Sequence, residues 1–250
     1  MINSGRAPLK ASEQLARRIR TDMAAGALPV GTMLPPEAKM MSDLGVGRPT
    51  LREALRLLEA ESLVRVRRGA HGGVEVTPPT TEAAAQTLSL VLTYLGAPLG
   101  EILSIRAALE IEAFESLLAQ RSVRAVTVAV TEVIEANADL GPADAATALA
   151  ADDAFRRAAL DGAKAPARVL IAELLGDMTR VQRAENVARL TGQAARRYVG
   201  GVTAAHGGII CALLADDRPR ALEFWRALCT DTAAVSGPKN RRVALMPPTG

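Results

Sequence analysis

The stretch Leu44-Gly-Val-Gly-Arg-Pro-Thr-Leu-Arg-Glu-Ala-Leu55 decides the fold of the first part of this chain. Gly45 and Gly47 interrupt one helical pattern, and Pro49 suits the first turn of a new helix, where a missing N–H costs no hydrogen bond. After Pro49, apolar residues recur every three to four positions, so the new helix has one apolar face and carries arginines on its other faces. Two helices joined by a short glycine-bearing turn form a helix-turn-helix.

Two helices are predicted upstream of this turn. Residues 11–25 carry an apolar stripe that ends at Gly26, and residues 37–44 follow a proline-rich connector, Leu28–Pro36. Downstream, the stretch Val64–Val76 has two alternating arms around a glycine-rich turn, which predicts a small basic β-hairpin, or wing.

Every long segment beyond the hairpin has a helical pattern. We therefore expect a mainly α protein with an N-terminal winged helix-turn-helix and a C-terminal all-α bundle. The predicted helices cover residues 82–95, 99–120, 122–138, 143–161, 166–190, 194–215 and 218–234. The predicted domains are 1–78 for DNA binding, a proline-rich linker at 79–84, a helical domain at 85–235 and a disordered tail at 236–250.

Composition narrows the class of protein. Hydrophobic residues make up 49% of the 250 residues and charged residues 23%, which excludes a wholly disordered chain. Residues 1–80 hold 12 basic and 8 acidic side chains, so the basic part coincides with the helix-turn-helix. Two cysteines are too few for a disulfide framework, and the long charge-free runs contain polar and glycine residues. We expect a cytoplasmic protein without a membrane span.

The segment Gly26–Gly73 resembles the winged helix-turn-helix of the GntR family of bacterial transcription regulators. The resemblance rests on Gly26-Ala-Leu-Pro-Val-Gly-Thr-Met-Leu-Pro-Pro-Glu37, on the stretch quoted first, and on Leu58-Glu-Ala-Glu-Ser-Leu-Val-Arg-Val-Arg-Arg-Gly69. It implies a double-stranded DNA operator as partner, with the third helix in the major groove.

The start of that third helix is expected to read the operator. Arg48 or Arg52 can donate a fork of hydrogen bonds to guanine, and Thr50 is expected to bind a phosphate. The wing is expected to reach phosphates or the minor groove through Arg67, Arg68, His71 and Gly72.

Alternatives remain for this helix. Arg52 and Arg56 can lie on a solvated face instead and pair with neighbouring Glu53 and Glu59.

The sequence also departs from the GntR pattern at two places. The family usually has Arg after its Leu-Pro-x-Glu element, but this chain has Ala38 followed by Lys39. Pro49 stands where a Ser or Thr hydroxyl is common. The bases read at these points are therefore expected to differ from those of relatives.

Residues 85–235 resemble the FCD effector domain of the FadR subfamily. The motifs are Ile105-Arg-Ala-Ala-Leu-Glu110, Asp152-Asp-Ala-Phe-Arg-Arg157 and His206, followed by Ala212, Asp217, Ala221 and Trp225. The resemblance implies a helical bundle with a ligand cavity, a homodimer, and effector binding that changes DNA affinity.

Helical spacing independently places ionisable residues on core-facing stripes. The candidate effector-binding residues are Arg106, Asp152, Arg156 and His206. Buried ionisable groups need partners. In the alternative interpretation Arg106 pairs with Glu110 and Arg156 with Asp152, while His206 is a satisfied core histidine.

Many FCD domains hold a divalent metal with one Asp and three His, and the resemblance carries those positions onto Asp152, Arg156, His206 and Leu228. A guanidinium repels a cation and leucine offers no lone pair, so we expect neither a metal nor another cofactor. Arg156 is expected instead to attract the carboxylate or phosphate of an anionic effector, as in the metal-free branch that binds acyl thioesters.

The sequence therefore predicts a homodimeric, ligand-responsive transcription regulator, a repressor in most of this family. An anionic effector such as a carboxylic acid or acyl thioester would change operator affinity by binding two arrangements of the protein differently. The alternative is a constitutive DNA-binding regulator with a degenerate pocket. No enzyme is predicted, because the common catalytic and nucleotide-binding motifs are absent.

Overall fold

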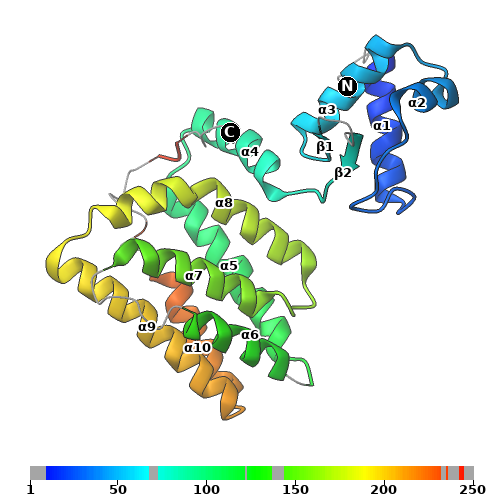
Figure 1. Ribbon diagram of the computed structural model, residues 1–250. Helices are drawn as coiled ribbons and strands as arrows, with labels where there is room; N and C mark the ends of the chain where they lie inside the picture. The colour runs from blue at the N-terminus through cyan, green and yellow to red at the C-terminus, as the bar shows by residue number, and fades with distance from the viewer. Residues whose placement is uncertain are drawn as a thin grey trace, which may run out of the picture. The chain divides into compact units, whose positions relative to one another are not determined.

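The structure is a computed structural model that describes residues 10–67, 73–121, 123–136, 144–231, 235 and 242–244. The described residues form ten helices and one two-stranded antiparallel sheet (Figure 1). They belong to two compact units, Met1–Ala83 and Ala84–Gly250. The predicted mainly α class with one small hairpin after the helix-turn-helix is confirmed.

The first unit contains three helices and the hairpin. The elements are α1 (Ala11–Ala24), α2 (Glu37–Leu44), α3 (Arg48–Ala60), β1 (Val64–Arg67) and β2 (Gly73–Val76). Gly45 ends α2 in the left-handed conformation, with φ of +63°, which glycine adopts at no steric cost. Pro49 lies in the first turn of α3, as the sequence predicts.

The core of this unit lies under the apolar face of α3. Leu51 and Leu58 are fully buried and pack with side chains from α1, α2 and both strands. The strands pair in antiparallel register from Val64 opposite Val76 to Arg67 opposite Gly73. This packing fixes which face of α3 remains exposed.

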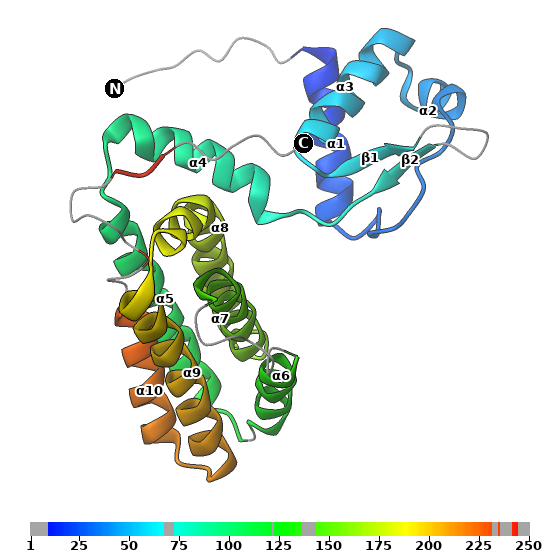
Figure 2. The same ribbon diagram turned by 60° about the vertical axis from the view of Figure 1, so that its left-hand side comes forward.

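The second unit is an all-helical bundle. Its elements are α4 (Thr81–Leu95), α5 (Leu99–Leu118), α6 (Arg124–Glu135), α7 (Ala145–Leu160), α8 (Pro166–Ala188), α9 (Gly192–Leu214) and α10 (Arg218–Thr230). Helix α5 packs against α7, α8 and α10, and α9 packs against α6, α7 and α10 (Figure 2). The predicted helices are all present, and α4 begins inside the segment expected to be linker.

Aromatic residues fill the centre of the bundle. The rings of Phe114 and Trp225 stack with centroids 4.4 Å apart, and Phe155 and Ile209 pack beside them, all fully buried. Among the described residues, α9 is the one helix long and apolar enough to cross a membrane. It carries the buried His206 and packs against three other helices, a position typical of the core helix of a bundle.

One sequence prediction is wrong in part. Disorder was expected throughout 236–250, but Arg242–Ala244 is packed: Val243 is 2% exposed and its N–H donates to the Ala97 carbonyl at 3.0 Å. The Gln182 side chain donates to the Arg242 carbonyl and accepts from the Ala244 N–H. The apolar run Val243-Ala-Leu-Met246, between arginines and prolines, is too short a pattern to predict this contact.

Candidate functional site

The predicted DNA-reading residues lie together at the start of α3. Because Leu51 and its apolar neighbours face the core, the side chains of Arg48 and Arg52 face outward, with 64% and 55% of their surfaces exposed. Thr50 is half-buried beside them. The geometry leaves both guanidinium groups accessible to a large polar partner.

One carboxylate holds both of these arginines. The Arg48 Nε donates to Glu37 Oε2 at 3.3 Å, and the Arg52 Nε lies 3.4 Å from Glu37 Oε1. Exposed ion pairs of this kind contribute little stability, so the arginines can exchange this partner for a stronger one. Arg56 pairs with Glu53 at 3.6 Å, as in the solvated-face alternative, whereas Arg52 does not.

In the described part of the wing, Arg65 and Arg67 occupy exposed positions of β1. The Arg67 Nη2 lies 2.7 Å from Glu75 Oε2 on the paired strand, and 55% of the Arg67 side chain is exposed. Arg68, His71 and Gly72, which were also predicted to touch DNA, lie outside the described residues. Glu59 accepts a hydrogen bond from the Val66 N–H at 3.2 Å and so links α3 to the wing.

In the helical unit the four predicted effector residues come together: Asp152 binds both Arg156 and His206, and Glu110 joins Arg106 to Arg156. Asp152 Oδ1 lies 3.0 Å from His206 Nε2, and Asp152 Oδ2 accepts from Arg156 Nε at 2.8 Å. The His206 ring stacks on Phe155 at 3.9 Å. The Arg106 Nε donates to Glu110 Oε1 at 2.7 Å. The pairs named in the alternative interpretation are therefore all present.

Arg156 is surrounded by acceptors from three helices. Besides Asp152, it donates to Glu110 Oε2 at 2.6 Å, to the Leu228 carbonyl at 2.9 Å and to Cys229 Sγ at 3.3 Å. Its side chain is 11% exposed. Removing this guanidinium would take away the cation that the buried Asp152 and Glu110 share.

Sequence reasoning missed two members of this cluster, Asp153 and Arg183. Arg183 donates from Nη1 and Nη2 to the two oxygens of Asp153, both at 2.9 Å, and Arg106 Nη2 donates to Asp153 Oδ1 at 3.3 Å. Arg183 lies on α8, where Thr179, Gln182 and Asn186 are also buried. This run of polar residues on one inward face of α8 was the signal in the sequence that could have identified Arg183.

The charges shift the pKa values of the cluster. Burial alone raises the pKa of Asp152, but Arg156 and His206 outweigh burial and hold it well below the ordinary value. Burial likewise raises the pKa of Asp153, yet Arg183 and Arg106 lower it overall. For Arg156 the burial effect is downward, and Asp152 and Glu110 raise the pKa well above the ordinary value. Asp152, Asp153 and Arg156 therefore stay ionised, each beside a side chain of opposite charge.

The family's metal does not fit these residues. Both oxygens of Asp152 and the Nε2 of His206 are used within the cluster, and the Arg156 guanidinium fills the space between the carboxylates. Leu228 supplies its carbonyl to that same guanidinium. A divalent ion at this place would meet a fixed positive charge.

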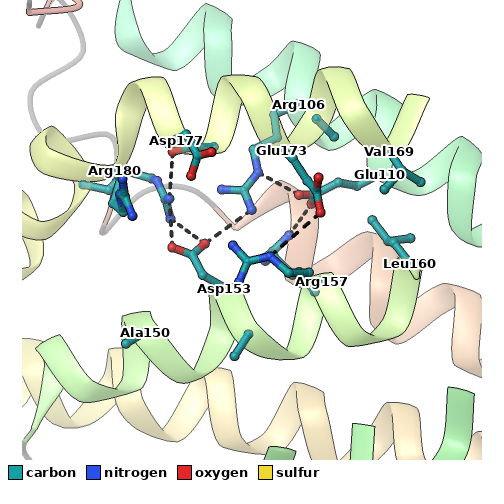
Figure 3. Close-up of a pocket in the computed structure, with 15 residues that line it drawn as sticks. Arg106, Glu110, Ala150, Asp153, Arg157, Leu160, Val169, Glu173, Asp177 and Arg180 are labelled. Atoms are coloured by element: carbon teal, nitrogen blue, oxygen red, sulfur yellow. Dashed lines mark hydrogen bonds and ion pairs between the residues drawn. The ribbon is translucent and has the colours of Figure 1, made fainter. Parts of the chain in front are cut away.

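Two cavities lie on either side of this cluster. The larger, about 230 Å³, lies between α5, α7 and α8 and is the one drawn in Figure 3. The smaller, about 50 Å³, lies beside Asp152, Tyr198 and Leu228. Arg106, Glu110, Arg156 and Arg183 line both cavities. The Tyr198 hydroxyl and the Arg183 Nε are buried there with no hydrogen-bond partner in the described structure.

In comparisons with known proteins, the first unit gives the best sequence matches. Residues 11–74 match the family model for bacterial regulatory proteins of the gntR family. The chain is 39% identical over 75 residues to the HTH-type transcriptional regulator Mce2R of Mycobacterium tuberculosis, a match that covers 26% of this chain and 31% of Mce2R. It is 33% identical over 92 residues to the transcriptional repressor NanR of Klebsiella aerogenes, covering 36% of this chain and 35% of NanR. The matches thus span about a third of these relatives.

A solved structure extends the likeness of fold to both units. The Streptococcus agalactiae GntR structure aligns with a TM-score of 0.58 and 19% identity, covering 88% of this chain and 98% of that one. The helices, turn and hairpin described above agree with the family match over the same residues. Over residues 11–74 this chain is therefore similar in sequence to the gntR family of bacterial regulatory proteins, and it folds there as a helix-turn-helix followed by a β-hairpin.

Proposed function

We propose that the protein is a DNA-binding transcription regulator that acts as a cytoplasmic homodimer and represses transcription. The observation that carries the proposal is the exposed pair Arg48 and Arg52 at the start of α3, in a domain of the gntR family. Arginine forks at this place in a helix-turn-helix donate to guanine in the major groove. Thr50 and Arg67 are suited to phosphates. Arg68, His71 and Gly72 remain proposed wing contacts.

The proposal includes a small effector that changes operator affinity. Arg106, Asp152, Arg156 and His206 gather in the helical unit beside two cavities, where a carboxylic acid or acyl thioester would find charged partners. Such an effector shifts the DNA-binding equilibrium only by the difference between its affinities for the two states of the protein.

One observation favours a second candidate, a regulator that binds DNA constitutively. Asp152, Arg156 and His206 are bonded to one another, and the chamber beside them has a volume of about 50 Å³. That is room for a water molecule or two and not for an organic acid. In this candidate the charged cluster only holds the bundle together.

Gel shifts test the DNA-binding proposal. The probe is the DNA upstream of the protein's own gene, and the control is a shuffled duplex of equal length. Affinity for the best site is expected to exceed that for shuffled DNA by about a thousandfold or more and to fall steeply with salt. A ratio that stays within about tenfold would contradict sequence-specific binding.

Thermal unfolding separates the two candidates. An effector that binds only the folded protein raises Tm as its concentration exceeds Kd, and the operator complex should weaken in the same concentration range. A constitutive regulator shows neither effect with any candidate acid, although its operator binding is intact.

A further inference from the structure

The larger cavity differs from the family's metal position in size and in lining. It lies between α5, α7 and α8, has a volume of about 230 Å³ and opens to the surface (Figure 3). The smaller chamber beside Asp152 and His206 is too small for an organic molecule. The larger cavity can hold a small metabolite, although it is below the usual size for drug-like ligands.

The lining of the larger cavity is charged and nearly balanced. It contains five arginines and four acidic residues: Arg106, Arg156, Arg157, Arg180, Arg183, Glu110, Asp153, Glu173 and Asp177. At the exposed side Arg157 lies 3.8 Å from Glu173. Opposite charges therefore alternate from the rim to the inner wall, so a single charged group meets both attraction and repulsion.

Asp153 is the most accessible member of the inner wall. Its side chain is 21% exposed, whereas those of Glu110, Arg106 and Arg183 are 3%, 11% and 4% exposed. Both of its oxygens accept from Arg183, and one also accepts from Arg106. The two arginines would donate in the same way to the carboxylate of a ligand.

The inner wall has an unused donor and a glycine against which both arginines pack. The Arg183 Nε is buried without a partner, so the guanidinium still has a hydrogen to donate. Gly176 lies against Arg106, where a Cβ would come within 3.2 Å of the guanidinium carbon, and its carbonyl accepts from Arg183 at 3.1 Å. Glycine at this position lets both arginines lie close to α8.

We propose that this cavity binds a small amino acid as a zwitterion and that this amino acid, a carboxylic acid that also carries an ammonium group, is the effector of the proposed regulator. The ligand carboxylate takes the place of Asp153 on Arg106 and Arg183, and the ligand ammonium group then pairs with the displaced Asp153. A plain acid would leave the half-buried Asp153 unpaired, and a plain amine would leave the arginines without a carboxylate. Only a ligand with both charges keeps every partner satisfied.

The first test compares matched ligands on the full-length wild-type protein. The twenty amino acids are compared with the corresponding acids that lack the amino group and amines that lack the carboxylate, such as L-leucine, 4-methylpentanoate and isopentylamine. At least one amino acid should raise Tm by about 5–10 °C when it is about 100-fold above its Kd. Its matched acid and amine should not. An acid or amine as effective as the amino acid, or a Tm that no amino acid moves, overturns the proposal.

The second test changes the charge preference. Asp153→Asn leaves Arg106 and Arg183 without their shared carboxylate, so this variant should prefer the matched acid over the amino acid by about tenfold in Kd, measured by calorimetry. Asp161→Asn, at the exposed end of α7 and outside the cavity lining, is the control and should keep the wild-type preference. A folded Asp153→Asn variant with the wild-type preference overturns the proposal.

A third variant covers the case in which Asp153→Asn does not fold. Ala154→Leu adds volume to the half-buried lining and keeps the charged cluster, so the amino acid should no longer raise Tm. An unchanged shift overturns the proposal. Gel shifts without ligand distinguish the failure of the two proposals. If the protein binds an amino acid but shows no specific DNA binding, the proposal of a transcription regulator is refuted. If it binds specific DNA but no amino acid, only the proposal of an amino acid effector is refuted.

Discussion

The two units use arginine in opposite ways. On α3, Arg48 and Arg52 are 64% and 55% exposed and share one carboxylate at 3.3–3.4 Å. In the helical unit, Arg156 and Arg183 are 11% and 4% exposed, and each donates to several acceptors. The first pair is easily released to bind a large partner, whereas the second is held within the fold and can be reached only by a ligand small enough to enter the cavity beside it. Burial, more than residue type, therefore decides which kind of partner an arginine can recognise.

The largest expected effect is on stability and comes from replacing one of the buried arginines. Arg156→Met should lower the free energy of unfolding of the helical unit by about 3–5 kcal/mol, because Asp152 and Glu110 lose their shared cation. Trp225, the only tryptophan, is fully buried in that unit and donates to the Glu110 carbonyl, so its fluorescence reports urea unfolding there. Arg56→Met, in the first unit, is the control, and its urea unfolding is followed by circular dichroism because that unit contains no tryptophan.

Arg56 is 77% exposed and lies 3.6 Å from Glu53, so its loss should change stability by less than about 1 kcal/mol. Equal losses for the buried and the exposed variant would contradict the distinction between the two sets of arginines.

Replacing the exposed arginines of α3 should weaken DNA binding and leave stability unchanged. Arg48→Ala and Arg52→Ala are each expected to weaken operator binding by about 1–3 kcal/mol in gel shifts, because each removes a base-reading fork. Urea unfolding should be unchanged. Arg67→Ala is the comparison and should weaken binding to operator and shuffled DNA alike. If Arg48 and Arg52 behaved as Arg67 does, they would be phosphate contacts.

Acid titration sharpens the comparison for one buried carboxylate. In the folded protein the pKa of Asp152 lies below the ordinary value for an aspartate, which is near 3.9 and applies to the unfolded chain. At acid pH the unfolded chain therefore binds a proton at Asp152 that the folded protein does not bind. The stabilisation is present above about pH 4 and is lost as pH falls below it, at up to about 1.4 kcal/mol per pH unit. Asp152→Asn should reduce that slope, measured by urea unfolding between about pH 4 and pH 2.5. An identical slope would contradict the ionised pair with Arg156.

The smallest effect is a difference between two thiols. Burial raises the pKa of Cys229 to about 12, and the thiol lies against Arg156 and Glu110, whereas Cys211 is exposed. At pH 8 Cys229 therefore stays a thiol, whereas the thiolate is the form that reacts. Iodoacetamide should therefore label one thiol per folded chain, detected by mass spectrometry. Cys211→Ser should abolish the label, and a label that remains on the folded variant would contradict the buried position of Cys229.

Local pattern predicts much of the fold and less of the charged cluster. The period of apolar residues and the proline and glycine stops predict α3, the hairpin and the seven bundle helices, because those signals act within a few residues. Arg106–Glu110 and Arg156–Asp152 are also predictable, since each pair is four residues apart on one helix. Arg183 and Asp153 meet across two helices, and nothing in either helix alone specifies that contact.

The packing of Val243 has a consequence for how the protein folds during synthesis. The Val243 carbonyl accepts from Thr93 Oγ1 across 150 residues, and its side chain completes the core beside α5 and α8. The helix-turn-helix unit has its core within residues 15–76 and can therefore fold while the ribosome still translates the bundle. The helical unit, in contrast, reaches its final packing only after the segment around Val243 has left the ribosome.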